Sequence, residues 1–286
     1  MAQTENDKFL FIHVLKTGGT SFTNILGTNF EDSQQYPEAC LVPDADFATR
    51  MEAYMYLPTF LANVNSLGKQ LKMVRAHVPY AVRNLLNHNY RVLTILRNPI
   101  DRTLSYLKHA RKYHPEHLGM DLEDIYEDPW LNACFIKNYQ TKIFSMSDEE
   151  IQVKNQFPSD APRLPSVQAI QDGQALSEEI TAFRESFPTH FLWGLFAPCT
   201  GAITVDNKRL ATAKENLADL ELVGVTEAYD RFLEQLIKKF GWKIASAPHL
   251  HAGEPDTTVS AAFRNRIADD CAFDMELYEY ARLLSA

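Results

Sequence analysis

The sequence predicts an α/β protein with three layers, in which helices flank a central, mainly parallel sheet. Two stretches favour this class, because each is a short apolar run that leads through a turn into a helical pattern. The first starts at Phe9 and the second at Arg91. Between them, residues 71–77 form a third apolar run, followed by a helix that Pro79 opens. Strands that alternate with helices in this way typically form a parallel sheet.

The rest of the chain follows the same rules. Apolar residues at helical spacing predict helices over residues 20–26, 46–65 with a break at Pro58, 99–113, 210–220 and 229–240, and a strand over 222–225. Residues 28–45 are polar and contain two prolines, so we expect a loop there. Residues 145–175 contain three prolines and show little periodicity, which predicts a mobile insertion or lid.

The composition favours one sizeable hydrophobic core. Hydrophobic residues make up 45% of the 286 residues, so we expect a single domain over residues 1–286. The formal charge of −9 argues against a general basic surface for nucleic acid. No apolar run approaches the roughly 18 residues of a membrane span, and the polar start lacks the pattern of a signal peptide. The four cysteines are far apart, which predicts reduced, mostly buried thiols.

The turn after the first predicted strand has the composition of an anion-binding loop. Its two glycines allow positive φ angles, so that successive backbone N–H groups can converge on one anion at the start of a helix. Hydroxyl side chains add donors, and the lysine adds a positive charge. The loop therefore predicts a P-loop-like phosphate site. Its candidate cofactor-binding residues are Lys16, Thr17, Gly18, Gly19, Thr20 and Ser21.

The order of residues in this loop distinguishes it from a nucleotide triphosphatase loop. In G-x-x-x-x-G-K-[ST] the lysine follows the glycines, whereas here Lys16 precedes them. The sequence K-T-G-G-T-S-F after a strand resembles the 5′-phosphosulfate loop of sulfotransferases that use 3′-phosphoadenosine 5′-phosphosulfate (PAPS). The resemblance is strongest to the branch of heparan sulfate 2-O-sulfotransferase and its bacterial relatives.

The second strand and helix carry a matching signature. Arg97 ends the apolar run from Arg91, and Ser105 lies about two turns into the following helix. These two residues resemble the family's 3′-phosphate clamp. A guanidinium can donate to two phosphate oxygens at once, and a hydroxyl can reach a third. Segments around Asn138–Lys142 and Val223–Trp242 also resemble bacterial members, and for the first of them either nucleotide or acceptor contacts, or simple helix packing, remain open.

A histidine at the end of the middle predicted strand is the candidate base. Ligands of open parallel sheets bind beyond the carboxyl ends of the strands, where Lys16, His77 and Arg97 are predicted to meet. The segment around His77 resembles one whose histidine is the catalytic base in the 2-O-sulfotransferase branch. We expect His13, inside the first strand, to be a core residue. His249 and His251 make only a weak metal candidate, and we predict no metal.

The resemblance implies a PAPS-dependent sulfotransferase of class EC 2.8.2. It would move a sulfuryl group from PAPS to an acceptor hydroxyl of a carbohydrate or small-molecule alcohol, and release adenosine 3′,5′-bisphosphate (PAP). His77 would accept the hydroxyl proton, and Lys16 would stabilise the transferred group. Because the eukaryotic relatives are Golgi membrane proteins, the lack of an anchor predicts a cytoplasmic, bacterial enzyme. The alternatives are a nucleotide phosphotransferase and a nucleotide-binding module without catalysis.

Overall fold

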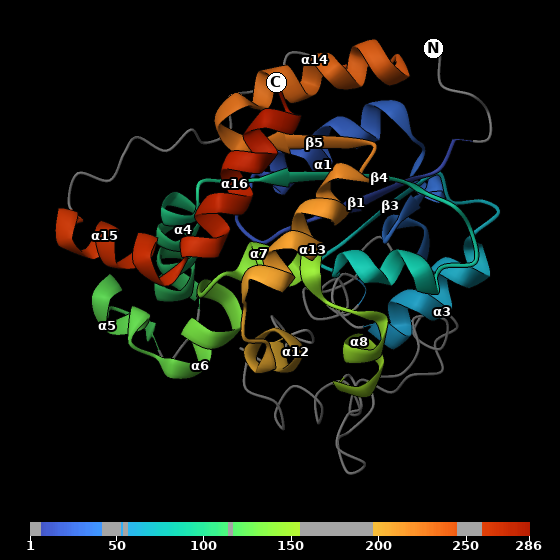
Figure 1. Cartoon of the computed structure of the whole chain (residues 1–286). Coiled ribbons are helices and arrows are strands. Elements are labelled where there is room, and N and C mark those ends of the chain that lie inside the picture. The colour runs from blue at the N-terminus through green and yellow to red at the C-terminus, as the bar shows by residue number, and fades with distance from the viewer. Residues whose placement is uncertain (1–6, 42–52, 54–56, 114–116, 155–196, 245–258) are drawn as a thin grey trace.

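The computed structural model describes residues 7–41, 53, 57–113, 117–154, 197–244 and 259–286. Within these ranges the chain forms a five-stranded sheet with helices on both faces (Figure 1). Every neighbouring pair of strands is parallel, and the strand order is β2-β3-β1-β4-β5. The predicted α/β class is therefore confirmed.

The first strand lies in the middle of the sheet. Ile12, its last residue, aligns with Ala76 on one side and with Thr94 on the other. Because all strands run the same way, the residues that follow them emerge at one edge. The strands are β1 (Phe9–Ile12), β2 (Gln35–Tyr36), β3 (Met73–Ala76), β4 (Arg91–Leu96) and β5 (Leu222–Val225).

Helices connect the strands and continue beyond the last one. Those between β1 and β4 are α1 (Gly19–Asn29), η1 (Asp32–Gln34), η2 (Glu38–Cys40), α3 (Leu57–Leu67) and η3 (Tyr80–Leu85). Between β4 and β5 lie α4 (Pro99–Tyr113), α5 (Leu122–Tyr126), α6 (Pro129–Leu131), the π-helical turn η5 (Asn132–Ile136), α7 (Tyr139–Ser145), α8 (Asp148–Lys154), α12 (Ala197–Ala202) and α13 (Asn207–Ala218). After β5 come η6 (Thr226–Ala228), α14 (Tyr229–Phe240), α15 (Ala261–Asp270) and α16 (Ala272–Leu284).

Alternate strand residues enter two separate hydrophobic cores, one on each face of the sheet. In β1, Phe9 and Phe11 pack with α1 and α14, whereas Leu10 and Ile12 join a larger cluster on the other face. The smaller core is rich in aromatic rings, and fully buried Trp242 stands edge-on to Phe9 at a centroid distance of 5.3 Å. This alternation places helices against both faces, so every strand residue except Arg91 is buried.

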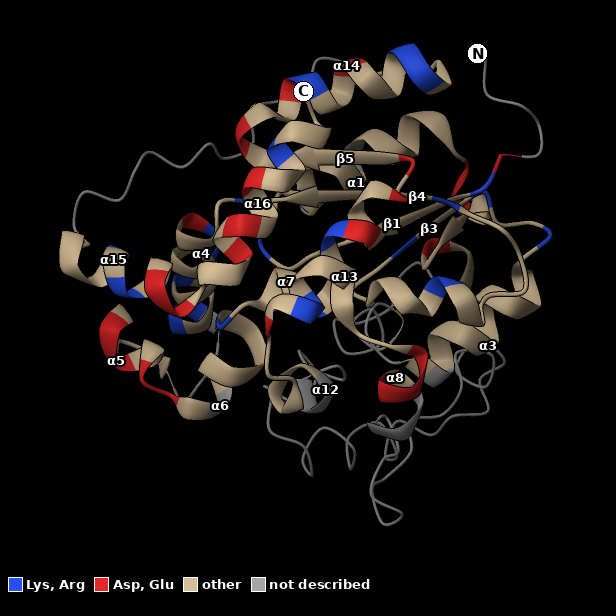
Figure 2. Cartoon of the chain, in the orientation of Figure 1, with Lys and Arg blue, Asp and Glu red and all other residues tan. Residues whose placement is uncertain are grey.

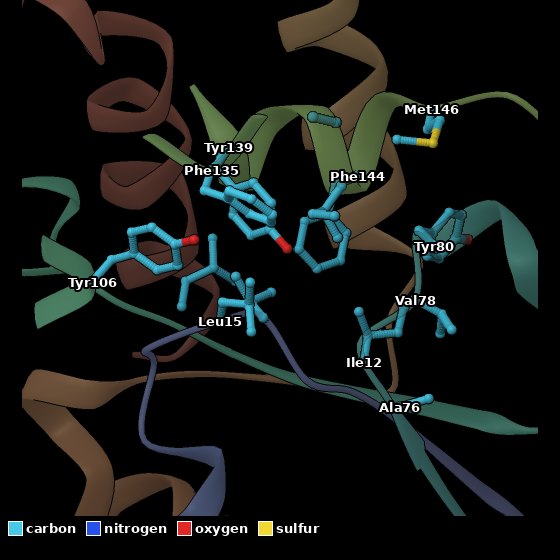
Figure 3. Packing of buried hydrophobic residues seen from close by; sticks show 14 of the residues in the cluster. Ile12, Leu15, Ala76, Val78, Tyr80, Tyr106, Phe135, Tyr139, Phe144 and Met146 are labelled. Carbon is cyan, nitrogen blue, oxygen red and sulfur yellow. The ribbon is translucent and has the colours of Figure 1, made fainter. Parts of the chain in front are cut away.

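The larger core fills the space between the sheet and the helices that follow β4. Phe135, Tyr139 and Phe144 extend from η5 and α7 toward the end of β1 (Figure 3). The ring of Phe135 stacks on that of Tyr106 from α4 at 5.2 Å. These contacts fix the position of α7 beside the residues that follow β1 and β4.

Most predicted elements are present with shifted ends. The structure confirms the helix over residues 99–113, but β1 ends at Ile12, and α1 begins at Gly19 and continues to Asn29. The prediction of a loop over residues 28–45 is wrong at β2, whose two residues are too few to show a periodic pattern. Pro58 lies near the start of the described part of α3.

Several predictions fall partly outside the described residues. The expected helix over 46–65 is described only at Ala53 and from Leu57 onward. The expected lid over 145–175 is described to residue 154, where α8 lies, and the rest of it falls outside the described residues. The weak metal candidates His249 and His251 also fall outside them.

Charged residues are distributed over the whole fold (Figure 2), and the described cysteines are buried. Lys and Arg are spread over many elements, with Asp and Glu between them (Figure 2). Cys40, Cys134 and Cys271 are buried thiols, as predicted, whereas Cys199 lies outside the described side chains. Within the described ranges, no helix has the length and hydropathy needed to cross a membrane.

Candidate functional site

The turn between β1 and α1 has an unusual backbone. Lys16 adopts a φ of 67° and Gly18 a φ of 88°, so two residues in three are left-handed. Such a conformation is unfavourable for lysine and persists only where the surroundings hold it. Two hydroxyls supply that support: Thr17 Oγ1 donates to the Val14 carbonyl at 2.9 Å, and Thr226 Oγ1 lies 2.8 Å from the Thr17 carbonyl.

The amino end of α1 begins directly at the glycines. Gly18 is its N-cap and makes no side-chain cap hydrogen bond. The first N–H groups of a helix lack partners inside it, and the helix dipole adds partial positive charge there. Thr20 and Ser21 lie in this first turn, as predicted. The turn therefore has the backbone donors of an anion site.

His77 follows the last residue of β3 and lies beside His13, which follows the last residue of β1. Their rings are 4.2 Å apart, and His77 Nδ1 lies 2.6 Å from the His13 carbonyl oxygen. A carbonyl can only accept, so Nδ1 of His77 carries the proton and donates it. The other ring nitrogen, Nε2, is then the unprotonated one, which is the tautomer that a base requires.

The position of His13 differs from the sequence expectation. It lies just past the strand and is half-buried, not enclosed in a core. A methyl group added to Gly19 would lie 2.1 Å from His13 Nε2, so the imidazole fills the space beneath the first turn of α1. A signal for this pairing was present in the sequence, because Phe-Leu-Phe-Ile-His13 and Met-Val-Arg-Ala-His77 place a histidine at the same point of neighbouring strands.

Burial lowers the pKa of both histidines. The pKa of His77 falls to about 4, because burial disfavours the imidazolium, the hydrogen bond to His13 opposes this, and the nearby charge of Lys16 lowers the pKa further. The pKa of His13 lies well below 6.5, first through burial and then through repulsion by His77 and Arg75. Both rings are therefore neutral at pH 7.

Arg97 is the first residue after β4, and two side chains, Gln140 and Glu227, hold the main chain around it. Its N–H donates to Gln140 Oε1 at 3.1 Å, and its carbonyl accepts from Gln140 Nε2 at 2.9 Å. The guanidinium reaches the Lys16 carbonyl at 3.3 Å. Next to it, the Asn98 N–H donates to Glu227 Oε1 at 3.0 Å. The structure thus brings Arg97 to the lysine loop.

Ser105 lies half-buried on α4, two turns beyond Arg97. In the part of the chain that the structure describes, no hydrogen bond joins its hydroxyl to Arg97 or to the loop. Arg102 on the same helix is fully buried, donates to the Leu15 carbonyl at 3.4 Å and also bonds the Phe135 carbonyl. Helix α4 therefore begins beside Arg97 and, through Arg102, also contacts the chain just before the lysine loop.

Lys16 lies in a strongly cationic setting. Its pKa is lowered from 10.5 chiefly by burial and then by Arg97 and Arg102, so each charged group that perturbs it is itself positive. The protein as a whole carries a formal charge of −9. Positive charge is thus concentrated at the carboxyl ends of β1 and β4, where an anion would relieve the repulsion.

A groove of about 760 Å³ lies elsewhere, at the amino ends of β4 and β5. Its wall includes Arg91 and Lys239, both of which pair with Glu221, at 3.0 and 2.6 Å. None of the predicted site residues lines this groove, which lies at the opposite end of the strands.

The residues that sequence reasoning missed are those that hold the site together. Gln140, Thr226 and Glu227 each bond the main chain of a predicted site region. These residues lie in the two segments, Asn138–Lys142 and Val223–Trp242, that resemble bacterial family members but whose role the resemblance left open. Lys142, in the first of them, is buried and donates to the Ala133 carbonyl at 2.7 Å, and burial lowers its pKa to about 8.

Comparison with known proteins decides the family. A family model described as "Sulfotransferase family" matches residues 1–144, just over half of the chain. The chain belongs to the sulfotransferase family. A search of curated proteins finds no significant match.

The matched part of this sulfotransferase contains every predicted site residue. It includes Lys16, His77, Arg97 and Ser105, and it also reaches Gln140. Membership in the family supports a transferase that uses a sulfuryl donor such as PAPS and an acceptor with a hydroxyl or similar group. The match ends before β5, so the contacts from Thr226 and Glu227 come from outside it.

Proposed function

We propose that this sulfotransferase uses PAPS and transfers its sulfuryl group to a hydroxyl with His77 as the base. The observation that carries the proposal is the cationic setting of Lys16, whose charge lies near those of Arg97 and Arg102. Lys16 belongs to a loop with two left-handed residues, and the Arg97 guanidinium contacts the carbonyl of Lys16. An anion with phosphate-like groups at both ends suits two such cationic regions on neighbouring strands. PAPS has this form, with a 5′-phosphosulfate and a 3′-phosphate.

The first region would hold the phosphosulfate. The backbone N–H groups at residues 17–20 and the Ser21 hydroxyl are the candidate donors, together with Lys16. Thr17 would contribute through its main chain, because its hydroxyl already donates to the Val14 carbonyl. The guanidinium of Arg97 would hold the 3′-phosphate, with Ser105 as its partner.

The reaction would be an in-line displacement at sulfur. The acceptor oxygen forms a bond to sulfur while the bond from sulfur to the 5′-phosphate oxygen breaks, and PAP leaves. His77 Nε2 takes the acceptor proton, because Nδ1 is committed to the His13 carbonyl. Lys16 would stabilise the charge that grows on the leaving phosphate oxygen, as in other transfers that rely on fixed electrostatics.

The rival enzyme class is a nucleotide phosphotransferase. It would call for a lysine after the glycines and a carboxylate that holds magnesium next to the loop. The loop has the reverse order, and the charged groups that act on Lys16 are arginines. A binding module without catalysis would not need a histidine fixed in the tautomer of a base. We therefore favour the sulfotransferase reaction with PAPS.

Thermal unfolding with nucleotides tests the donor. PAP should raise the melting temperature, since a ligand that binds only the native state adds about 2.7 kcal/mol at a hundredfold excess over Kd. ATP lacks the 3′-phosphate and should stabilise much less. Equal shifts with PAP and ATP would contradict the assignment of Arg97 and Ser105.

Product release tests the reaction and the acceptor class. Purified protein is mixed with PAPS and, in separate reactions, with oligosaccharides or with small-molecule alcohols, and the PAP formed is measured. We expect release above the rate without acceptor in at least one of these classes. Stable PAP binding with no release in any of them would instead favour the module without catalysis.

A further inference from the structure

We propose that Gln140 and Asp274 form a relay that positions Arg97, so that a carboxylate in the last described helix sets how well the site recognises the 3′-phosphate. The inference rests on the proposed function, because it takes Arg97 as the residue that binds this group. Neither side chain needs to touch the nucleotide, so both are positioning residues.

The first step of the relay is the amide of Gln140. Arg97 lies between the end of β4 and the start of α4, so no strand partner holds its main chain. The Gln140 carboxamide replaces that partner by accepting from the Arg97 N–H and donating to the Arg97 carbonyl, at 3.1 and 2.9 Å. Gln140 is fully buried. Only one orientation of its amide satisfies both bonds.

The second step is the carboxylate of Asp274 on α16. Its Oδ2 accepts from the Gln140 N–H at 3.0 Å, and its Oδ1 accepts from the N–H and the hydroxyl of Thr141, both at 2.7 Å. These contacts hold the first turn of α7, from which the Gln140 side chain reaches Arg97. Asn138 completes the link, because its Oδ1 accepts from the Asp274 N–H at 3.1 Å.

The arrangement suits an ionised Asp274. Two backbone N–H groups and the Thr141 hydroxyl face its oxygens, and a carboxylate can accept from all three. Burial raises the pKa of Asp274, but the bonds from Thr141 and Gln140 and the positive charge of Arg102 oppose that rise. Arg102 also reaches the Leu15 carbonyl, so the same carboxylate stabilises a cation that supports the lysine loop.

The expected consequence is selectivity between two nucleotides. PAP and adenosine 5′-monophosphate (AMP) differ by the 3′-phosphate, so the ratio of their dissociation constants reports on the residues that bind this group, Arg97 and its partner Ser105. Both constants are measured by calorimetry on the same folded protein, which cancels any loss of overall stability. A charge-assisted hydrogen bond corresponds to about a tenfold or larger change in affinity.

Gln140→Met keeps the size of the side chain and removes both bonds to Arg97. We expect the preference for PAP over AMP to fall about tenfold, while AMP affinity stays unchanged. Asp274→Asn should also lower the preference for PAP over AMP, because the NH₂ group of the new amide would face a backbone N–H of Gln140 or Thr141 and could not accept from it. Thr141→Val is the matched control, because it removes a buried bond to the Asp274 carboxylate but leaves the bond from Gln140 to Asp274. The preference of this variant for PAP over AMP should equal that of the unchanged protein.

A double variant tests whether the two residues act in sequence. If Asp274 works through Gln140, the Gln140→Met and Asp274→Asn changes together should lower the preference no further than Gln140→Met does. The relay would be overturned if the two single changes lower the preference for PAP over AMP by factors that multiply in the double variant. An unchanged preference in Gln140→Met would also overturn it. Equal binding of PAP and AMP by the unchanged protein would instead overturn the proposed function, and the relay with it.

Discussion

The two cationic regions of the site are built in different ways. The lysine loop after β1 takes its donors from six consecutive residues, Lys16–Ser21, and one distant hydroxyl, that of Thr226, supports its main chain. The arginine after β4 is a single residue that is held by partners 43 positions away, at Gln140, and by Glu227, 129 positions from Asn98. The donors of the first region are thus contiguous in sequence, whereas the second region depends on distant partners for its single arginine.

This difference separates chemistry from recognition. The histidine pair and Lys16 gather around β1 and β3, where the sulfuryl group would move. The region around Arg97 would hold a phosphate that takes no part in bond breaking. Changes in the first region should therefore affect turnover, and changes in the second should affect binding.

The largest effect should come from His77→Ala. Removal of a positioned base typically lowers turnover by about 10²- to 10⁴-fold. PAP affinity should change little, because in the proposed mechanism His77 would contact the acceptor hydroxyl and not the nucleotide. Turnover and PAP affinity are measured on the same preparation. Near-normal turnover in the folded variant would assign the base to another residue.

Arg97→Met is the counterpart in the second region. It keeps much of the side-chain length but loses the guanidinium, and PAP affinity should fall roughly 10- to 100-fold. The turnover rate at saturating PAPS should fall far less. A large loss of that rate with unchanged PAP affinity would reverse the division between the two regions.

Two glycines of α1 sharpen the comparison within one helix. A methyl group at Gly19 would collide with the His13 ring at 2.1 Å. A methyl group at Gly27 would have no atom within 4 Å apart from the backbone of its own helix. Gly19→Ala should cost about 1–3 kcal/mol and displace His13 toward His77. Gly27→Ala should stabilise the protein by about 0.5–1 kcal/mol. Chemical denaturation of both variants measures the difference, and equal effects would show that His13 moves aside freely.

The histidine pair should also make the protein sensitive to acid. The folded pKa values of both rings lie below 6.5, so the unfolded chain binds more protons between pH 6.5 and about 4. Their contribution to stability is therefore complete above pH 6.5 and is lost as the pH falls through this window. Denaturation midpoints across that range should fall less steeply in His77→Phe, which removes one titrating ring.

The smallest effect should come from the residue that joins the two regions. Thr226 Oγ1 lies 2.8 Å from the Thr17 carbonyl and 3.1 Å from the Leu96 carbonyl, so it links the lysine loop to the end of β4. Thr226→Val should cost about 1 kcal/mol. Thr23→Val, which loses only a bond to the Gly19 carbonyl inside α1, should cost less. Equal costs would leave Thr226 without a special role.

The contrast also explains what the sequence could predict. The α/β class, the lysine loop and the helix over residues 99–113 follow from local patterns of glycine, apolar spacing and proline, and each is present. The structure also joins Arg97 to the Lys16 carbonyl. The roles of Gln140, Thr226 and Asp274 could not be predicted, because no local pattern states which distant main-chain group a polar side chain will bond. His13 was misplaced because the first strand ends at Ile12, before this residue.

The contact between Asp274 and α7 has a consequence for the order in which the protein is made. Asp274 lies 134 residues after Gln140, so it leaves the ribosome long after β1, β3 and β4 have been synthesised. The six residues of the lysine loop are contiguous, so an emerging chain carries all of them long before α16 is made. The arginine half of the site gains its carboxylate only when α16 docks. Selectivity for the nucleotide would thus be the last property that the growing protein acquires.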